Sequence, residues 1–415
     1  MAVFRALSIL TVVLAIAACT STGSVTRYPV APRPPQAPSA APVPQQPVVT
    51  TQPLAPREGP IVAPPPGATP PVPGPLQPQG AAPGSRLIAV LLPQSGTHLQ
   101  SAQAIRAGVL AAWYADSAPG KPELRFFDTA AGAVSAYRAA LAGGAERVIG
   151  PLLKEDIASL AQEGEVAAPT LALNRIDDAR ENLYQFALWP EDELEQVANQ
   201  ARRDGRSRAL VLAPAAPLGQ RMIHHFTGYW RREGGEISAI VTFPPNDRDY
   251  SATLSKLLAV GPAADFLLLA GVDARDARLI VPQFRSADSR RLPVYATSHL
   301  FGGRTDRERD QELTGVVFCD GPAVLSGMSP GTDWPEGAAV PRLFAMGQDA
   351  WQIARRLDEW RANPGSAISG ASGSLSLNVG NRVHRRLSCA RFEQGEPVSQ
   401  GLAPEKSPPP SLPLR

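Results

Sequence analysis

Apolar runs alternate with segments of helical periodicity from about residue 86 onward. The run 87–92 is apolar at every position, as expected of a parallel strand that is buried on both faces. Apolar residues then recur at three- and four-residue spacing, which predicts a helix through Leu99, Ala102, Ile105, Val109 and Trp113. The same alternation continues along the chain. We therefore predict an α/β fold built from repeated strand and helix units.

The predicted strands fall into two series, which indicate two doubly wound parallel-sheet lobes. The first lobe is expected at about residues 86–189 plus later segments, and the second at about 205–297. After the first run, the predicted strands are 124–127, 147–149, 170–173, 185–188, then 209–212, 237–243, 266–270 and 294–297.

Two helices and two late strands complete the predicted domain, 86–393. The first helix has Pro190 at its first position, acidic residues in its first turn, Arg202 and Arg203 in its last turn and Gly205 beyond its end. The second has a long apolar face: Leu343, Met346, Ala350, Ile353, Leu357 and Trp360. The last β-like runs are 374–377 and 382–392.

The N-terminus has the pattern of a lipoprotein signal peptide, residues 1–18. A basic start and an apolar stretch lead to Ile16-Ala17-Ala18-Cys19, which resembles a lipobox with Cys19 as the lipidation site. An ordinary secretory signal with a chance cysteine is the alternative. Thr20 follows in place of the aspartate that retains many lipoproteins in the inner membrane, so we expect lipid anchoring, through palmitate-type acyl chains, in the outer membrane.

Residues 19–85 hold about 20 of the 44 prolines and few charges, so they cannot build a core. We predict a disordered linker with polyproline II character, which could reach on the order of 200 Å. A passive spacer is favoured over a ligand for a proline-binding module. The tail 394–415 is predicted to be disordered as well.

Charge and motif content argue for a protein without catalytic chemistry. The net charge of +2 argues against nucleic acid as a partner. The arginines at 382, 385 and 386 could meet an acidic partner, but a solvated face is favoured. Phosphate-binding glycine loops and the hydrolase nucleophile elbow are absent from the sequence. His224 and His225 point about 100° apart on a helix and favour its surface over a metal site. We expect no cofactor, no metal and no enzyme activity.

Eight colinear segments resemble the C-terminal domain of the penicillin-binding-protein activator lipoproteins, with a type I periplasmic-binding-protein architecture. The segments are 89–96 (AVLLPQSG), 148–154 (VIGPLLK), 171–174 (LALN), 186–193 (FALWPEDE), 218–221 (LGQR), 230–235, 342–350 (RLFAMGQDA) and 370–377.

This resemblance implies an outer-membrane regulator of cell-wall synthesis and cell shape. Its partner would be a bifunctional peptidoglycan synthase, a class A penicillin-binding protein, which it contacts from the periplasmic side. The best-known members carry an N-terminal domain of helical repeats, whereas here a proline-rich linker takes that place. The alternative is a lipid-anchored solute-binding protein that delivers an amino acid or peptide to a transporter. Cleft chemistry separates the two, because a solute binder needs convergent polar and charged groups.

Ser95 and Gly96 mark the candidate ligand site in the cleft, together with Asn174. The turn follows the first strand and precedes a helix whose free N–H groups could hold an anion. In amino-acid-binding relatives of this fold, the equivalent region grips the ligand carboxylate. The other interpretation, favoured for an activator, is a tight strand-to-helix turn, and a bound small molecule is not expected.

Cys319 and Cys389 are the cysteines left after lipidation, and both lie in β-like runs. An even pair in an oxidising periplasm predicts a candidate disulfide, with two separate buried thiols as the alternative.

Overall fold

The structure, a computed structural model, describes residues 86–164, 166–178, 180–327, 340–363, 365–378 and 380–405. The predicted signal peptide, Cys19 and the proline-rich linker lie outside these residues. The end of the predicted tail, from residue 406, also lies outside them.

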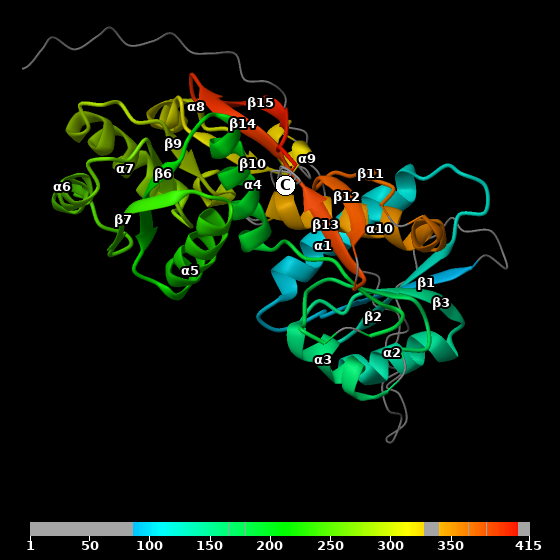
Figure 1. The fold of residues 1–415 in the computed structure, drawn as a ribbon. Helices are drawn as coiled ribbons and strands as arrows, with labels where there is room; N and C mark the ends of the chain where they lie inside the picture. The colour runs from blue at the N-terminus through cyan, green and yellow to red at the C-terminus, as the bar shows by residue number, and fades with distance from the viewer. Residues whose placement is uncertain are drawn as a thin grey trace, which may run out of the picture. The chain divides into compact units, whose positions relative to one another are not determined.

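Two mixed sheets with mainly parallel strands form the cores of two lobes (Figure 1). The first sheet has eight strands in the order β11-β12-β13-β5-β4-β3-β1-β2, and the second has seven in the order β15-β14-β10-β9-β8-β6-β7. Strands β1 to β5 are mutually parallel, as are β6 to β10. The predicted fold class of two doubly wound lobes is therefore confirmed.

The first lobe begins with five strands and three helices in alternation. They are β1 (Leu87–Leu92), α1 (Leu99–Ala115), β2 (Glu123–Asp128), α2 (Ala133–Ala142), β3 (Ala145–Ile149), α3 (Lys154–Gln162), β4 (Thr170–Ala172) and β5 (Leu183–Gln185). It is completed by α10 (Val340–Ala362), β11 (Ile368–Ser369), β12 (Ser374–Asn378) and β13 (Arg382–Arg386).

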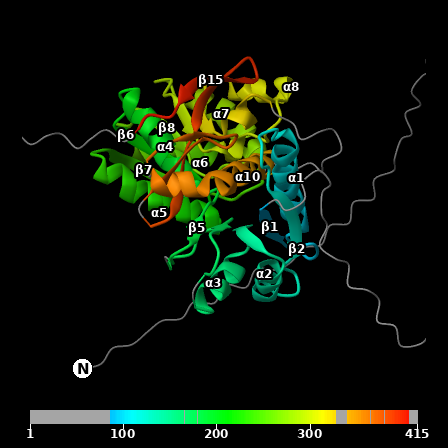
Figure 2. The same cartoon turned by 90° about the vertical axis from the view of Figure 1, so that its right-hand side faces the viewer.

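Every residue of β1 is buried, because helices cover both faces of the first sheet. Its even-numbered residues pack with α1 and α10, and its odd-numbered residues pack with α2 and α3. In Figure 2, α2 and α3 lie together below the strands of this sheet. The continuous apolar run in the sequence is thus explained by burial on two sides.

The second lobe repeats this design. Its elements are α4 (Pro190–Arg203), β6 (Arg208–Pro214), α5 (Pro217–Arg232), β7 (Glu236–Phe243), α6 (Ser251–Val260), β8 (Phe266–Leu269), α7 (Ala274–Ala287), β9 (Val294–Ala296), α8 (Arg307–Asp310), β10 (Val317–Asp320), α9 (Pro322–Leu325), β14 (Ser388–Glu393) and β15 (Glu396–Leu402). Alternate residues of β6 pack with α4 and α5 on one face and with α6 and α7 on the other. The helix predicted to start at Pro190, with Arg202 and Arg203 in its last turn, is confirmed as α4.

Helices α1 and α10 pack so closely that two glycines are required where they touch (Figure 1). A Cβ atom on Gly108 would lie 2.0 Å from the carbonyl oxygen of Phe344, and one on Gly347 would lie 2.1 Å from that of Ile105. Real Cβ atoms do not approach a carbonyl oxygen this closely. The long predicted helix is therefore confirmed as α10, held directly against α1.

The chain passes from one sheet to the other three times among the described strands. It crosses through α4, then between β10 and β11, and finally between β13 and β14. At the last crossing a single residue, Leu387, separates a strand of the first sheet from a strand of the second.

The structure corrects four boundaries. The predicted run 382–392 is two strands in different sheets, because an apolar pattern does not reveal which sheet a strand joins. The second lobe extends beyond residue 297 to include β10, β14 and β15. Strand β15 lies in the predicted tail 394–415, since it pairs with β14 although most of its residues are exposed. The predicted strand 185–188 is shifted, as β5 ends at Gln185.

Candidate functional site

A pocket of about 660 Å³ opens where the carboxyl ends of β3, β4 and β5 meet the starts of α3 and α4. Ligands of open α/β sheets bind outside this edge of the strands. We call it the carboxyl-edge pocket. Its lining residues, all from first-lobe strands and their connections, are Lys154, Glu155, Ala158, Arg175, Ile176, Asp177, Trp189 and Arg382.

Trp189 forms the aromatic wall of the carboxyl-edge pocket. The ammonium of Lys154 lies 4.7 Å from its ring centroid, and the guanidinium carbon of Arg175 lies 5.4 Å from it. Arg175 also donates two hydrogen bonds to the carboxylate of Asp192, one with an Nη1–Oδ1 distance of 3.1 Å. The bidentate pair fixes Arg175, so the ring and the two cations form one ordered wall.

Both helices that start at the carboxyl-edge pocket lack a side-chain cap. Leu153 precedes α3 and Trp189 precedes α4, and neither side chain accepts a hydrogen bond from the first turn. The first backbone N–H groups of a helix have no partner within the helix and favour an anion. Only α3 offers such a donor at its first residue, Lys154, because α4 begins with Pro190, which has no N–H, and both first turns carry acidic side chains.

The predicted ligand residues are not brought together in one pocket. Ser95 and Gly96 are exposed, and Gly96 has a φ of +82° and accepts a hydrogen bond from Leu99, as in a tight turn that begins a helix. Asn174 lies next to the carboxyl-edge pocket, but its side-chain nitrogen donates to the carbonyl of Leu152 and its oxygen accepts from the backbone of Arg175. Its amide thus holds two loops in place.

A smaller cavity of about 110 Å³ lies beside the Ser95 turn and is mainly apolar. It is lined by Leu92, Pro93, Gln94, Leu99, Ala102, Gln103, Arg106, Phe126 and Phe127. It shares no lining residue with the carboxyl-edge pocket. The backbone N–H of Gln94 donates to Asp128, 2.9 Å away, which fixes the turn without a ligand.

Sequence reasoning missed the residues that line the carboxyl-edge pocket. Lys154 and Trp189 fall inside segments that resemble the activator family, yet neither has a recognisable chemical motif around it. Arg382 was expected on a solvated arginine face, and Arg385 from the same group is buried. The available signal was positional, since Lys154, Arg175 and Trp189 each closely follow a strand of the same parallel sheet.

A buried cluster of charges, here called the crossover cluster, lies where the chain passes between the sheets. It consists of Glu193, Asp320, Arg342, Asp349 and Arg385. From α10, Arg342 donates to Asp320 and to the carbonyl oxygens of Ser298 and Phe301. Glu193 accepts from the backbone of Ser298. These bonds join α4 and α10 to the second sheet.

Asp349 satisfies the backbone of the turn after β11. Its carboxylate accepts from the N–H groups of Ala371 and Ser372 and from the Ser372 hydroxyl, at 2.6–2.7 Å. Burial raises the pKa of Asp349 to about 6, although these hydrogen bonds lower it. A carboxyl group so fully enclosed contacts no solvent and has a structural role.

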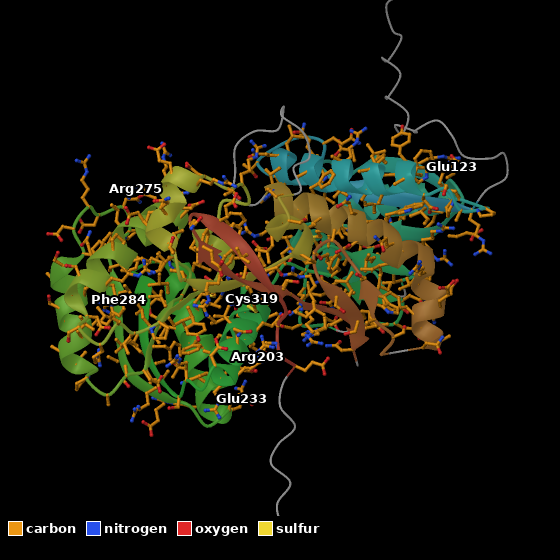
Figure 3. The ribbon with its side chains drawn as sticks, turned by 90° about the horizontal axis from the view of Figure 1, so that it is seen from above. Glu123, Arg203, Glu233, Arg275, Phe284 and Cys319 are labelled. Carbon is orange, nitrogen blue, oxygen red and sulfur yellow. A yellow bond between two sulfur atoms is a disulfide. The ribbon has the colours of Figure 1, made fainter. Side chains whose placement is uncertain are left out.

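Cys319 and Cys389 form a disulfide between β10 and β14. Figure 3 labels Cys319 among the side chains of the structure. The two residues are direct partners in the antiparallel ladder, and both are fully buried. The bond lies two residues after the crossing at Leu387. It thereby ties the last strands of the chain to the second sheet.

The two adjacent histidines of α5 occupy different environments. His225 lies 2.9 Å from Glu195 of α4, and His224 is exposed. Among residues 86–405 that are described, no three His, Cys, Asp or Glu side chains are grouped as metal ligands. No described helix is both long and apolar enough to cross a membrane.

A family profile described as "LppC putative lipoprotein" matches residues 83–395. The chain belongs to this family. The LppC profile covers both lobes and all three crossings between the sheets. The match begins at residue 83, within the last three residues of the predicted proline-rich linker, and ends at residue 395, directly before β15.

Among curated relatives of this LppC-family chain is "Penicillin-binding protein activator LpoA" from Pectobacterium parmentieri. The two are 29% identical over 301 residues, which is 61% of this chain and 44% of the relative. The chain thus spans less than half the length of this relative.

Two solved structures share the fold of the LppC-family chain. One is the LpoA (YraM) C-domain from Haemophilus influenzae, "a regulator of PBP1A", with a TM-score of 0.62 and 25% identity, covering 75% of this chain and 99% of that one. The other is a "putative branched-chain amino acid ABC transporter" from Chromobacterium violaceum, with a TM-score of 0.62 and 31% identity, covering 74% and 100%. The architecture is that of the type I periplasmic binding proteins.

Proposed function

We propose that this protein is an outer-membrane lipoprotein that binds and activates a peptidoglycan synthase, a class A penicillin-binding protein. The observation that carries the proposal is the match of both lobes to the C-domain of LpoA, described as a regulator of PBP1A. The curated relatives named as penicillin-binding protein activators align with the same region. In this role the domain acts by contact, with no chemical step of its own.

The lipid anchor and the linker would let the domain reach a synthase at a distance from the outer membrane. Cys19 would carry the lipid, and residues 19–85 would span part of the periplasm between the outer membrane and the synthase. A proline-rich chain of that length reaches on the order of 200 Å when extended. The lipoprotein family supports this placement on the periplasmic side of the envelope.

A reconstituted synthase assay tests the proposal. Purified full-length lipoprotein in detergent is mixed with a class A penicillin-binding protein, and complex formation, glycan-chain growth and peptide cross-linking are followed together. We expect specific binding and a faster reaction, with no effect on a class B enzyme as the control. An unchanged rate and no complex at saturating lipoprotein would contradict the proposal.

Solute binding is the second candidate, and the Chromobacterium violaceum structure favours it because of its name and its 31% identity. Thermal unfolding with and without leucine, isoleucine or valine tests it. A rise in Tm with these ligands, together with no effect on the synthase, would replace the activator role by solute delivery.

A further inference from the structure

Four charged side chains around the carboxyl-edge pocket form no ion pair with any described residue. Two are cationic, Lys154 and Arg382, and two are anionic, Glu155 and Asp177. Lys154 contacts the ring of Trp189, and no hydrogen bond joins its ammonium to a described residue. A pocket with unpaired charges of both signs offers binding groups to a ligand that carries both signs.

Arg175, in the same pocket, differs from these four residues because it forms an ion pair with Asp192. Its bidentate contact leaves Arg175 little capacity for a ligand beyond Nε, which is buried without a partner. The pair therefore acts as a fixed wall. The charges left for a ligand are the four that lack an ion pair, of which Arg382 also donates to the carbonyl oxygen of Ile176 at 3.5 Å.

The start of α3 adds donors beside the two cations. Lys154 is the first residue of this helix, and no side chain caps it. Carboxylates are favoured at such a position, while ammonium groups are favoured beside Glu155 and Asp177. Lys154, Glu155 and Asp177 are exposed to solvent, and a purely apolar side chain such as that of leucine gives none of them a partner, so these charges favour an ionic ligand over leucine.

From this arrangement we propose that the carboxyl-edge pocket binds a short peptide carrying at least two carboxylates and one ammonium group. The pocket volume of about 660 Å³ lies within the range of small-ligand sites and exceeds the needs of a single amino acid. The stem peptides of peptidoglycan have this set of charges. Their choice as the probe rests on the proposed function, whereas the charge argument does not.

Calorimetric titration of the full-length protein with L-alanyl-γ-D-glutamyl-meso-diaminopimelate tests the proposal. We expect saturable binding that weakens at least about tenfold in Lys154→Gln and in Asp177→Asn, because each loses one charge contact with the ligand. Lys256→Gln is the matched control, since Lys256 is an exposed lysine of α6 far along the chain from the pocket. It should bind the peptide like the wild type.

A second measurement needs no variant of the protein. The same tripeptide with its diaminopimelate carboxylates amidated should bind at least about tenfold more weakly. The proposal is wrong if the tripeptide does not bind, if leucine binds equally well, or if neither variant nor amidation changes the affinity. Synthase activation measured on the same preparations separates the two ideas: activation without peptide binding overturns only this inference.

Discussion

Asp349 shows how a single buried residue links this fold to pH. Its carboxylate holds the turn after β11 through three hydrogen bonds, and Gly370 leaves room for it, because a Cβ there would lie 2.7 Å from both carboxylate oxygens. Burial raises its pKa from 3.8 to about 6. The folded protein therefore binds a proton more tightly at Asp349 than the unfolded chain does.

Stability should fall as pH rises through the interval between these two pKa values. Below about pH 4 the carboxyl is protonated in both states, and above about pH 6 it is ionised in both. We expect the free energy of unfolding of the protein to fall by on the order of 3 kcal/mol across that interval because of Asp349. This loss is measured by urea unfolding of the wild type and of Asp349→Asn at several pH values from 4 to 7. A difference between the two proteins that does not change with pH would contradict this account.

At the scale of elements, the contact between α1 and α10 holds the first lobe together. Gly108 and Gly347 let the two backbones touch, and Trp351 and Arg355 of α10 both donate to Asp116 at the end of α1. The helices come from distant parts of the sequence, so this contact closes the layer over one face of the sheet.

Gly108→Ala and Gly347→Ala should each destabilise the protein by about 1–3 kcal/mol or more, because the added methyl overlaps a backbone carbonyl. Gly228→Ala on α5 is the matched control. Its new Cβ would meet only the tip of Arg232 at 3.7 Å, so helix propensity should make it neutral or stabilising by up to about 1 kcal/mol. Chemical denaturation compares all three. If all three variants changed the free energy of unfolding equally, the close contact between α1 and α10 would not require glycine.

At the scale of the whole molecule, the disulfide and the crossover cluster secure the passages between the sheets. The disulfide joins residues 70 positions apart, on either side of the whole first-lobe segment from α10 to β13. Arg342 binds the residue next to Cys319, since Asp320 follows it directly in β10. Covalent and ionic links thus meet at one place.

Replacing both cysteines, Cys319→Ala with Cys389→Ala, should cost roughly 4 kcal/mol, because the unfolded chain gains the freedom of a long open loop. Equilibrium urea unfolding gives the magnitude. Non-reducing mass spectrometry of the wild type checks that the bond is formed. A double variant as stable as the wild type would mean that the bond adds little to the folded state.

The sequence predicts much of the fold because burial on both sides of a sheet leaves continuous apolar runs. The proline and the charges at the ends of α4 predict where that helix starts and which residues form its last turn. Strand β15 was missed because it has one partner strand and few buried side chains. The carboxyl-edge pocket was also missed: Lys154, Arg175 and Trp189 are brought together only by sheet order, which local patterns do not encode. The role of Asn174 was missed for the same reason, because its side chain donates a hydrogen bond to Leu152 in another loop.

The abrupt crossing at Leu387 has a consequence for how the chain is assembled. Synthesis supplies the N-terminal segments first, and β10 lacks its antiparallel neighbour until residues 388–393 are present. A chain that ends before this point leaves a strand edge open to aggregation and a lone thiol at Cys319. Residues 388–393 therefore cover the open edge of β10 and supply the partner of Cys319 in a single step.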